Sequence, residues 1–172
     1  MTLVARISAD EIAAALRVLA QQVQARFGCS EPVLVLALLN GAAWFAADLL
    51  RLLPVNFRLE TLRVGSYGAG CESCGELRWE SPLPDCAGAR VLVLDDVLDS
   101  GITLHAVAAE LRRRGVAELA TAVVVDKAGR RRVEFEADFC AFHLGEAYLV
   151  GYGMDAAGLH RNLPYIAEVV EP

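Results

Sequence analysis

The stretch VLVLDDVLDSGITL, from Val91 to Leu104, constrains the fold of this chain more than any other. It opens with four consecutive apolar residues, Val91 to Leu94, which is typical of a parallel strand buried on both faces. Apolar residues then recur at helical spacing from Leu104 to Leu111, and Gly115 stands where helices commonly end. The stretch therefore predicts a strand, a short turn and a helix, in that order.

The predicted turn, Ser100 to Thr103, suits a phosphate group. Backbone N–H groups are free at the start of a helix, and the helix dipole favours an anion there. Gly101 allows a ligand to approach the backbone closely, and the two hydroxyl side chains of the turn add hydrogen-bonding groups.

Three carboxylates, Asp95, Asp96 and Asp99, stand directly before this turn. They would repel a simple anion, so the ligand must also bring hydroxyl groups, a metal ion or a proton. Asp95 and Asp96 could accept hydrogen bonds from two neighbouring sugar hydroxyls or hold Mg²⁺, and Asp99 could meet a titrating nitrogen. A sugar phosphate meets all these requirements, although an acidic turn in another doubly wound domain, such as a phosphate receiver, would also contain such residues.

Strand and helix patterns alternate along the rest of the chain. Apolar runs at Val33 to Leu38 and Leu119 to Val125 predict two more buried strands. A capping-box pattern from Ser8 to Glu11 precedes an apolar helical stripe that ends at Phe27. This alternation predicts an α/β protein with a central, mostly parallel sheet flanked by helices. Weaker patterns predict further strands at residues 56–64, 76–79 and 133–139.

Length and composition exclude several classes of protein. A chain of 172 residues with 55% hydrophobic residues is expected to fold as one domain. Its formal net charge of −6 argues against a general nucleic-acid binder. We find no signal-peptide pattern, so the five cysteines are expected to be free thiols and the protein to be soluble and cytoplasmic.

The run from Asp95 to Thr103 resembles the phosphoribosyl-diphosphate (PRPP) binding signature of type I phosphoribosyltransferases. Further segments resemble the hypoxanthine-guanine members of that family, and together the likeness spans about Val33 to Ile166. These segments are Leu39–Ala42 (a pyrophosphate loop that often contains a non-proline cis peptide), Ser66-Tyr67, Asp126-Lys127, Val150–Asp155 and Arg161–Tyr165.

This resemblance implies the type I phosphoribosyltransferase fold in a single domain over residues 1–172. The core would span about residues 30–145, and the N-terminal segment with about residues 146–172 would form a small hood. The glycine-rich segment at about residues 65–76 would be a mobile catalytic loop, and we favour this interpretation over a floppy hairpin tip, which such a composition also allows.

The resemblance also implies a reaction, transfer of the 5-phosphoribosyl group from PRPP to N9 of hypoxanthine or guanine, with Mg²⁺ as cofactor. Asp99 would be the acid/base, aided by Ser66 and Tyr67 of the catalytic loop. PRPP would be bound by Asp95, Asp96, Ser100, Gly101, Ile102 and Thr103, and its pyrophosphate by Leu39, Asn40, Gly41, Ala42, Arg161 and Arg63. The purine would contact Lys127, Tyr148, Leu149 and Asp155, and Mg²⁺ would be held by Asp95, Asp96 and Asp155.

Three positions depart from the common family pattern. Many members carry Lys where Asn40 stands, Glu where Asp95 stands and a polar residue where Ile102 stands. By the same resemblance the protein would be a homodimer or homotetramer. Its acidic net charge and its short apolar runs indicate that it binds neither nucleic acid nor membrane. Two alternative functions remain, a phosphoribosyltransferase for xanthine or another base and a PRPP-sensing regulatory protein. A regulator would be expected to carry a basic nucleic-acid-binding face, which this acidic chain lacks.

Four residues could be counted as zinc ligands, Cys71 and Cys74 in a C-x-x-C pair, and Cys140 and His143. Nothing in their spacing brings the two pairs together. We therefore expect no four-ligand zinc site.

Overall fold

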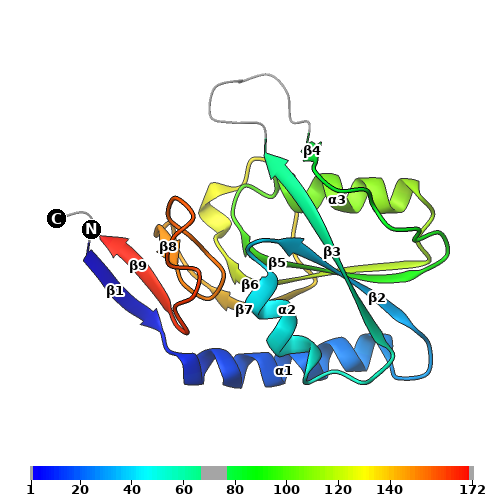
Figure 1. Ribbon diagram of the computed structural model, residues 1–172, viewed down its shortest axis with the longest axis horizontal. Coiled ribbons are helices and arrows are strands. Elements are labelled where there is room, and N and C mark those ends of the chain that lie inside the picture. Colours follow the sequence, from blue (N-terminus) through cyan, green and yellow to red (C-terminus); the bar gives the residue numbers. More distant parts are fainter. Residues whose placement is uncertain (1, 67–76, 171–172) are drawn as a thin grey trace.

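The computed structural model describes residues 2–66 and 77–170. Its centre is a six-stranded sheet with the strand order β4-β3-β2-β5-β6-β7 (Figure 1). The strands are β2 (Val33–Leu39), β3 (Phe57–Ser66), β4 (Leu77–Trp79), β5 (Arg90–Leu98), β6 (Glu118–Asp126) and β7 (Phe139–His143). Every neighbouring pair is parallel except β3 with β4. The prediction of a mostly parallel central sheet is confirmed.

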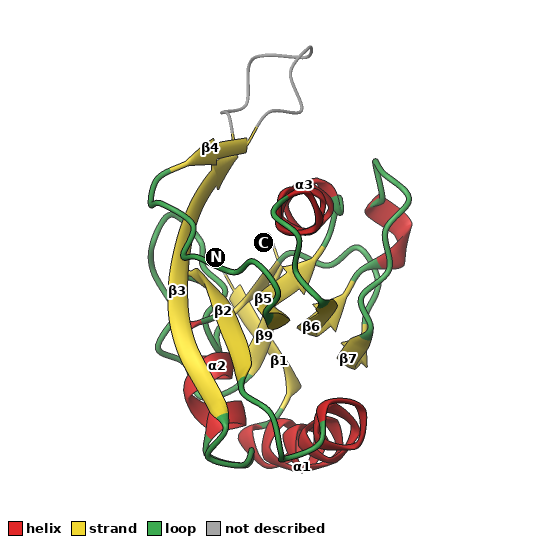
Figure 2. Ribbon diagram, turned by 90° about the vertical axis from the view of Figure 1, so that its right-hand side faces the viewer, coloured by secondary structure: helices red, strands yellow, loops and turns green. Residues whose placement is uncertain are grey.

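Helices cover both faces of this sheet (Figure 2). Helices α1 (Ala9–Phe27) and α2 (Ala43–Leu50) pack on one face, and α3 (Ile102–Arg113) packs on the other. Strand β2 shows why its sequence lacks polar alternation. Its residues 33, 35 and 37 belong to the core beneath α1 and α2, whereas residues 34, 36 and 38 belong to the core beneath α3.

Helix α1 begins as its sequence predicts. The Ser8 side chain accepts a hydrogen bond from the Glu11 backbone N–H at 3.3 Å, and the Ser8 N–H donates to the Glu11 carboxylate at 2.8 Å. This reciprocal capping box satisfies two N–H groups that the helix itself leaves free.

A second, three-stranded sheet has the order β1-β9-β8. It consists of β1 (Thr2–Ile7), β8 (Leu149–Val150) and β9 (Ile166–Val170), and it lies at one end of the larger sheet (Figure 1). Strands β1 and β9 are antiparallel, with Thr2 opposite Val170. We had assigned no element to residues 2–7, because a strand that pairs with residues far along the chain and buries only Ile7 leaves little local pattern.

The predicted strand over Val133 to Phe139 is wrong. Strand β7 begins only at Phe139, and residues 131–138 belong to no strand of the described chain. Their exposure nevertheless alternates residue by residue, with Phe135 and Ala137 packed against the core beneath α3. An extended segment that lies on a core produces the same period of two as a strand, without pairing to one.

The topology brings the carboxyl ends of β2, β5 and β6 together. These strands are adjacent in the sheet, and open α/β sheets bind ligands at this edge. Across residues 2–66 and 77–170, no helix is both long enough and apolar enough to cross a membrane.

Candidate active site

The turn between β2 and α2 lies against the acidic residues of β5. The Leu39–Asn40 peptide bond is cis, as the family resemblance implied. A Cβ atom added to Gly41 would lie 2.2 Å from Oδ2 of Asp96, and one added to Gly153 would lie 2.0 Å from the Gly41 carbonyl oxygen. The turn is therefore enclosed between Asp96 and the 151–154 segment, and a side chain at either glycine would force the Asp96 carboxylate or the Gly41 backbone to move.

Arg63 lies beside the same turn. It stands opposite Leu39 in the β2–β3 ladder, and its guanidinium donates to the Asn40 side-chain oxygen at 3.3 Å. The two residues that we expected near a pyrophosphate, Arg63 and Asn40, are thus in contact.

Asp95 and Asp96 form a pair of neighbouring acids near the end of β5. The Asp96 N–H donates to Oδ1 of Asp95 at 3.0 Å, and the Val97 N–H donates to Oδ1 of Asp96 at 2.8 Å. Burial, and then the charge of Asp96, raise the pKa of Asp95 well above its ordinary value of 3.8. Burial also raises the pKa of Asp96, against the opposing effects of its hydrogen bonds and of Arg161.

Two neighbouring, partly buried carboxylates with raised pKa values need a positive partner before both can be ionised. Oxygen donors of this kind are the ligands that Mg²⁺ prefers. The pair therefore fits a divalent cation.

The predicted phosphate turn borders a cavity of about 110 Å³. Gly101 has φ +80° and immediately precedes α3, and the Ile102 N–H donates to the Ser100 hydroxyl at 3.4 Å. The first amides of α3 therefore adjoin this cavity. Its lining consists of Asp95, Val97, Leu98, Asp99, Ser100, Gly101, Thr103 and Leu104.

Lys127 lies immediately beyond β6 and is only 5% exposed. Its N–H donates to the Leu98 carbonyl at 3.0 Å, and its Nζ lies 3.9 Å from Oδ2 of Asp99. Burial lowers the pKa of the Lys127 ammonium, and the charge of Asp99 opposes this effect. Arg130 also faces Asp99, with Nη1 3.8 Å from Oδ2. The buried lysine and the acid of the phosphate turn therefore face each other.

Segments near the end of the chain supply further polar groups. Arg161 donates to the Gly153 carbonyl at 2.6 Å and forms an ion pair of 2.6 Å with Asp155. The second Asp155 oxygen accepts from the Gly158 N–H at 2.6 Å. Because Gly153 contacts the β2–α2 turn, the Asp155–Arg161 pair is held close to that turn.

Tyr148 and Leu149 differ in their exposure. The Tyr148 side chain is 51% exposed, and its hydroxyl donates to the Asp155 carbonyl at 3.3 Å. Leu149 is buried in β8 and paired with Glu168 of β9. Tyr148 therefore presents an accessible ring, while Leu149 is fixed by the smaller sheet.

Arg131 is a site-forming residue that we did not single out from the sequence. Its guanidinium donates to the carbonyls of Leu98 at 2.8 Å and Asp99 at 2.6 Å, and it forms an ion pair with Asp126. These bonds tie the end of β5 to the end of β6. In sequence it is one member of the run Arg130-Arg131-Arg132, and nothing in that run distinguishes it from its neighbours.

The segment with the expected catalytic residues Ser66 and Tyr67 lies largely outside the described residues. Ser66 is the last residue of β3, and Tyr67 lies outside the described residues, as do Cys71 and Cys74. The catalytic loop expected at about residues 65–76 thus stays a prediction.

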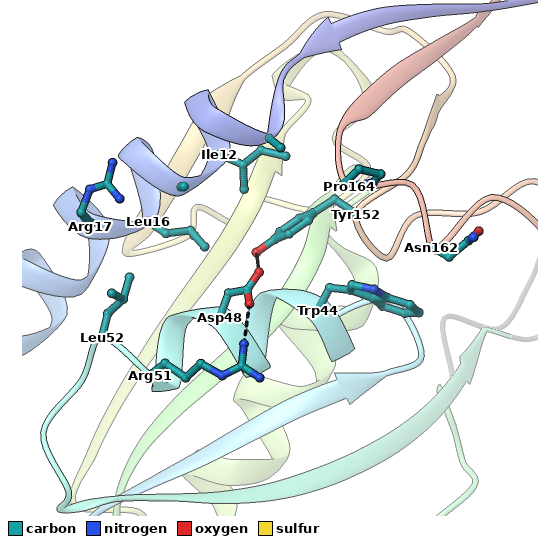
Figure 3. Close-up of a pocket in the computed structure, with 12 residues that line it drawn as sticks. Ile12, Leu16, Arg17, Trp44, Asp48, Arg51, Leu52, Tyr152, Asn162 and Pro164 are labelled. Carbon is teal, nitrogen blue, oxygen red and sulfur yellow. Dashed lines mark hydrogen bonds and ion pairs between the residues drawn. The ribbon is translucent and has the colours of Figure 1, made fainter.

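A separate cavity of about 460 Å³ lies between α1, α2 and the loop after β8 (Figure 3). Three of its polar residues bind one another, since the Tyr152 hydroxyl donates to Asp48 at 2.9 Å and Arg51 donates to Asp48 at 3.3 Å. None of the expected site residues lines it. The candidate active site is therefore the one at the carboxyl ends of the strands.

Comparison with known proteins identifies the family. Residues 7–150 match the phosphoribosyl transferase domain. The chain belongs to the phosphoribosyltransferase family. It is 37% identical over 158 residues to a hypoxanthine-guanine phosphoribosyltransferase of Aquifex aeolicus, covering 91% of this chain and 89% of that one. It is 35% identical to the hypoxanthine phosphoribosyltransferase of Escherichia coli K12, covering 93% and 91%.

A solved structure shows the same relationship. It is a hypoxanthine-guanine phosphoribosyltransferase from Bacillus anthracis with a HEPES molecule in its active site. The TM-score is 0.91 at 32% identity, over 97% of this chain and 98% of that one. The type I fold is confirmed, and this phosphoribosyltransferase is an enzyme.

Proposed function

We propose that this phosphoribosyltransferase transfers the 5-phosphoribosyl group of PRPP to N9 of hypoxanthine or guanine, giving IMP or GMP and pyrophosphate. One observation carries the proposal. The phosphate-binding turn and the buried Lys127 are joined through Leu98 and Asp99, so a sugar phosphate and a base can be held side by side. The names of the relatives support the same reaction.

The 5′-phosphate binds to Ser100, Gly101, Ile102 and Thr103 in this proposal. The first amides of α3 supply the hydrogen bonds and the favourable dipole. Asp95 and Asp96 accept hydrogen bonds from the 2′ and 3′ hydroxyls of the ribose.

The pyrophosphate binds to Leu39, Asn40, Gly41 and Ala42, with Arg63 and Arg161 as cationic partners. Asp95, Asp96 and Asp155 would hold Mg²⁺. When bound, the ion offsets the negative charge that gathers on the departing pyrophosphate. Gly41 holds the turn against Asp96, so the residues proposed for the pyrophosphate lie next to the carboxylate pair.

Asp99 acts as general acid/base at N7 of the purine. Its carboxylate lies in the phosphate turn and faces Lys127, so a base that contacts the lysine also approaches this acid. Proton transfer of this kind contributes about 10² to 10⁴ in rate. Ser66 and Tyr67 belong to the loop that we expect to cover the site during the reaction.

Lys127 donates to O6 of the purine, and Tyr148 stacks on the ring while the Leu149 backbone meets its edge. An amino group at C6, as in adenine, would place a donor opposite a donor and leave both unsatisfied. The pocket therefore favours oxopurines. Xanthine, which also carries the O6 oxygen, is the second candidate substrate.

A product-formation assay tests this function. Purified protein with Mg²⁺ and PRPP receives hypoxanthine, guanine, xanthine, adenine or uracil, and nucleotide formation is followed by absorbance. We expect product with hypoxanthine or guanine. Product only with adenine or uracil would refute the assignment of Lys127, and PRPP binding without turnover on any base would favour a regulatory protein.

The Asp99→Asn variant tests the catalytic role. It retains the size of the side chain, so PRPP binding should persist while kcat falls by about 10² to 10⁴. The exposed Asp85 provides the matched control, because Asp85→Asn makes the same chemical change far from the site. Unchanged turnover in Asp99→Asn would remove this residue from the acid/base role.

A further inference from the structure

Three potential metal ligands come together outside the catalytic site. Ligand atoms of Asp126, Cys140 and His143 all lie within 4.8 Å of one another. They border a cavity of about 570 Å³, whose lining also includes Arg131, Glu134 and Glu136. In sequence, Cys140 and His143 pair as possible ligands only with the distant C-x-x-C motif, whereas the fold brings Asp126 of β6 beside them.

Strand pairing creates this cluster. Asp126 ends β6 and stands opposite His143, the last residue of β7, and Cys140 stands opposite Val123 in the same ladder. Nδ1 of His143 lies 3.9 Å from Oδ2 of Asp126. The Leu144 N–H donates to the Asp126 carbonyl at 3.0 Å, which fixes the backbone just beyond the cluster.

The carboxylate of Asp126 is oriented for a ligand. Oδ1 forms the ion pair with Arg131, while Oδ2 faces His143. Metal-binding carboxylates are commonly held in this way by a hydrogen bond to the oxygen that does not bind the metal. A cation could therefore bind Oδ2 without displacing Arg131.

Access and charge also favour a cation. The Asp126 side chain is 13% exposed, whereas that of His143 is 77% exposed and free to turn. Donor atoms arranged tetrahedrally around zinc stand about 3.3 to 3.7 Å apart, for bond lengths of about 2.0 to 2.3 Å. A small rotation of the exposed imidazole thus suffices. Three carboxylates and one guanidinium lie around the cavity, so its charge attracts a cation.

We propose that Asp126, Cys140 and His143 form a binding site for Zn²⁺ or a similarly thiophilic divalent ion. One carboxylate oxygen, one thiolate and one imidazole nitrogen are a typical zinc ligand set, whereas Mg²⁺ prefers oxygen ligands alone. Water from the cavity occupies the fourth position. On binding, the Cys140 thiol releases its proton to solvent and the imidazole binds in its neutral form. The step involves no oxidation or reduction.

This site does not depend on the proposed reaction, because none of its three ligands contacts PRPP or purine in that scheme. It joins the ends of β6 and β7, and through Arg131 it adjoins the carbonyls of Leu98 and Asp99. A bound ion would therefore stabilise the sheet at the edge that carries the active site.

Cobalt titration of the full chain tests the proposal. Protein is reduced, freed of metal with a chelator and desalted, and Co²⁺ is added while the thiolate-to-cobalt charge-transfer band is recorded. A background variant with Cys29→Ser, Cys71→Ser and Cys74→Ser removes the exposed Cys29 and the C-x-x-C pair as sources of signal. We expect the charge-transfer band to form in this background, and Zn²⁺ but not excess Mg²⁺ to abolish it.

Single substitutions then identify the ligands. Cys140→Ser should abolish the charge-transfer band, and His143→Ala should weaken binding at least tenfold. The matched control is His105→Ala. His105 is also an exposed histidine, but it lies on α3, and its substitution should leave the cobalt affinity and the band unchanged. Because His143 is exposed, its substitution leaves the fold intact, and Zn²⁺ should raise Tm in the parent but not in His143→Ala. A band that vanishes in the background variant, or equal affinities with and without Cys140 and His143, would overturn the proposal.

Discussion

The backbone of Gly41 packs directly against the carboxylate of Asp96, so closely that an added Cβ atom would lie 2.2 Å from Oδ2 and 2.4 Å from Cγ. This contact joins the turn after β2 to the acidic pair of β5. In the proposed reaction, it places the residues that bind the pyrophosphate beside the residues that bind the ribose.

Gly41→Ala should therefore damage the site more than the fold. The methyl group must displace the turn or the carboxylate, and such overpacking costs about 1 to 3 kcal/mol. We expect kcat/KM to fall at least about tenfold, which corresponds to about 1.4 kcal/mol, in steady-state assays with PRPP and hypoxanthine. Gly145→Ala is the control, because an added Cβ there meets nothing within 4 Å. Equal activities of the two variants would contradict the role of this contact.

Replacing Lys127 should affect the base more than the sugar. Lys127→Met keeps an apolar stem but removes the donor to O6, and a hydrogen bond to a charged group contributes about 1.5 to 3 kcal/mol. We expect kcat/KM for hypoxanthine to fall by about 10 to 100-fold, with little change in PRPP binding measured by calorimetry. Arg130→Met removes another cation that faces Asp99, yet one that is half-exposed, and should have a smaller effect. Loss of PRPP binding in Lys127→Met would assign the lysine to the sugar instead.

The acidic pair should make stability depend on pH. Because burial raises the pKa of Asp95 above its ordinary 3.8 in the folded chain, the protonated form is favoured there. Its contribution to stability is therefore complete below that ordinary value and is lost as the pH rises through the raised value. Without Mg²⁺, Asp95→Asn should have a higher Tm than the parent at about pH 7, and the difference should shrink towards about pH 4.

The measurement is thermal unfolding by circular dichroism across this pH range. Glu60→Gln neutralises an exposed carboxylate of β3 and should leave the pH profile unchanged. A constant Tm difference between Asp95→Asn and the parent at every pH would show that the acid carries no buried charge.

Tyr152→Phe should weaken the link between α2 and the loop that contains Gly153. The Tyr152 hydroxyl, which is buried, donates to Asp48 at 2.9 Å (Figure 3). Burial is also the main cause that raises the pKa of this hydroxyl, so it remains a donor at all physiological pH values. Removing such a bond costs about 0.5 to 1.5 kcal/mol.

Urea unfolding measures this loss as a lower midpoint with an unchanged slope. Tyr148→Phe is the matched change, because its hydroxyl donates over 3.3 Å from a half-exposed ring and should contribute less. A greater loss of stability in Tyr148→Phe than in Tyr152→Phe would reverse this ranking.

Local sequence predicts the parts of the molecule whose chemistry is local. The apolar run before Asp95 and the turn at Gly101 lie next to each other in the chain, so one segment predicts strand, cavity and helix together. The predicted strand at residues 133–139 was wrong, because an extended chain that packs on a core shows the same alternation of buried and exposed residues as a strand.

Features that join distant segments left no such pattern. Strand β1 depends on β9 at the other end of the chain, and the burial of Lys127 depends on how the turn after β6 packs against the end of β5. The cluster of Asp126, Cys140 and His143 needs the register of β6 against β7. The family resemblance predicted that Lys127 contacts the purine. Its burial and its hydrogen bond to Leu98 are seen only in the structure.

The guanidinium of Arg131 bears on how natural variation in this enzyme should be judged. It donates to the carbonyl oxygens of Leu98 and Asp99 and pairs with the carboxylate of Asp126. In the proposed reaction it contacts no substrate. A screen that ranks positions by their distance from the substrate would pass over Arg131. Even its replacement by lysine would lose the planar guanidinium that bonds all these partners at once. Harmful alleles are to be sought at this codon as much as at those of the residues that touch the nucleotide.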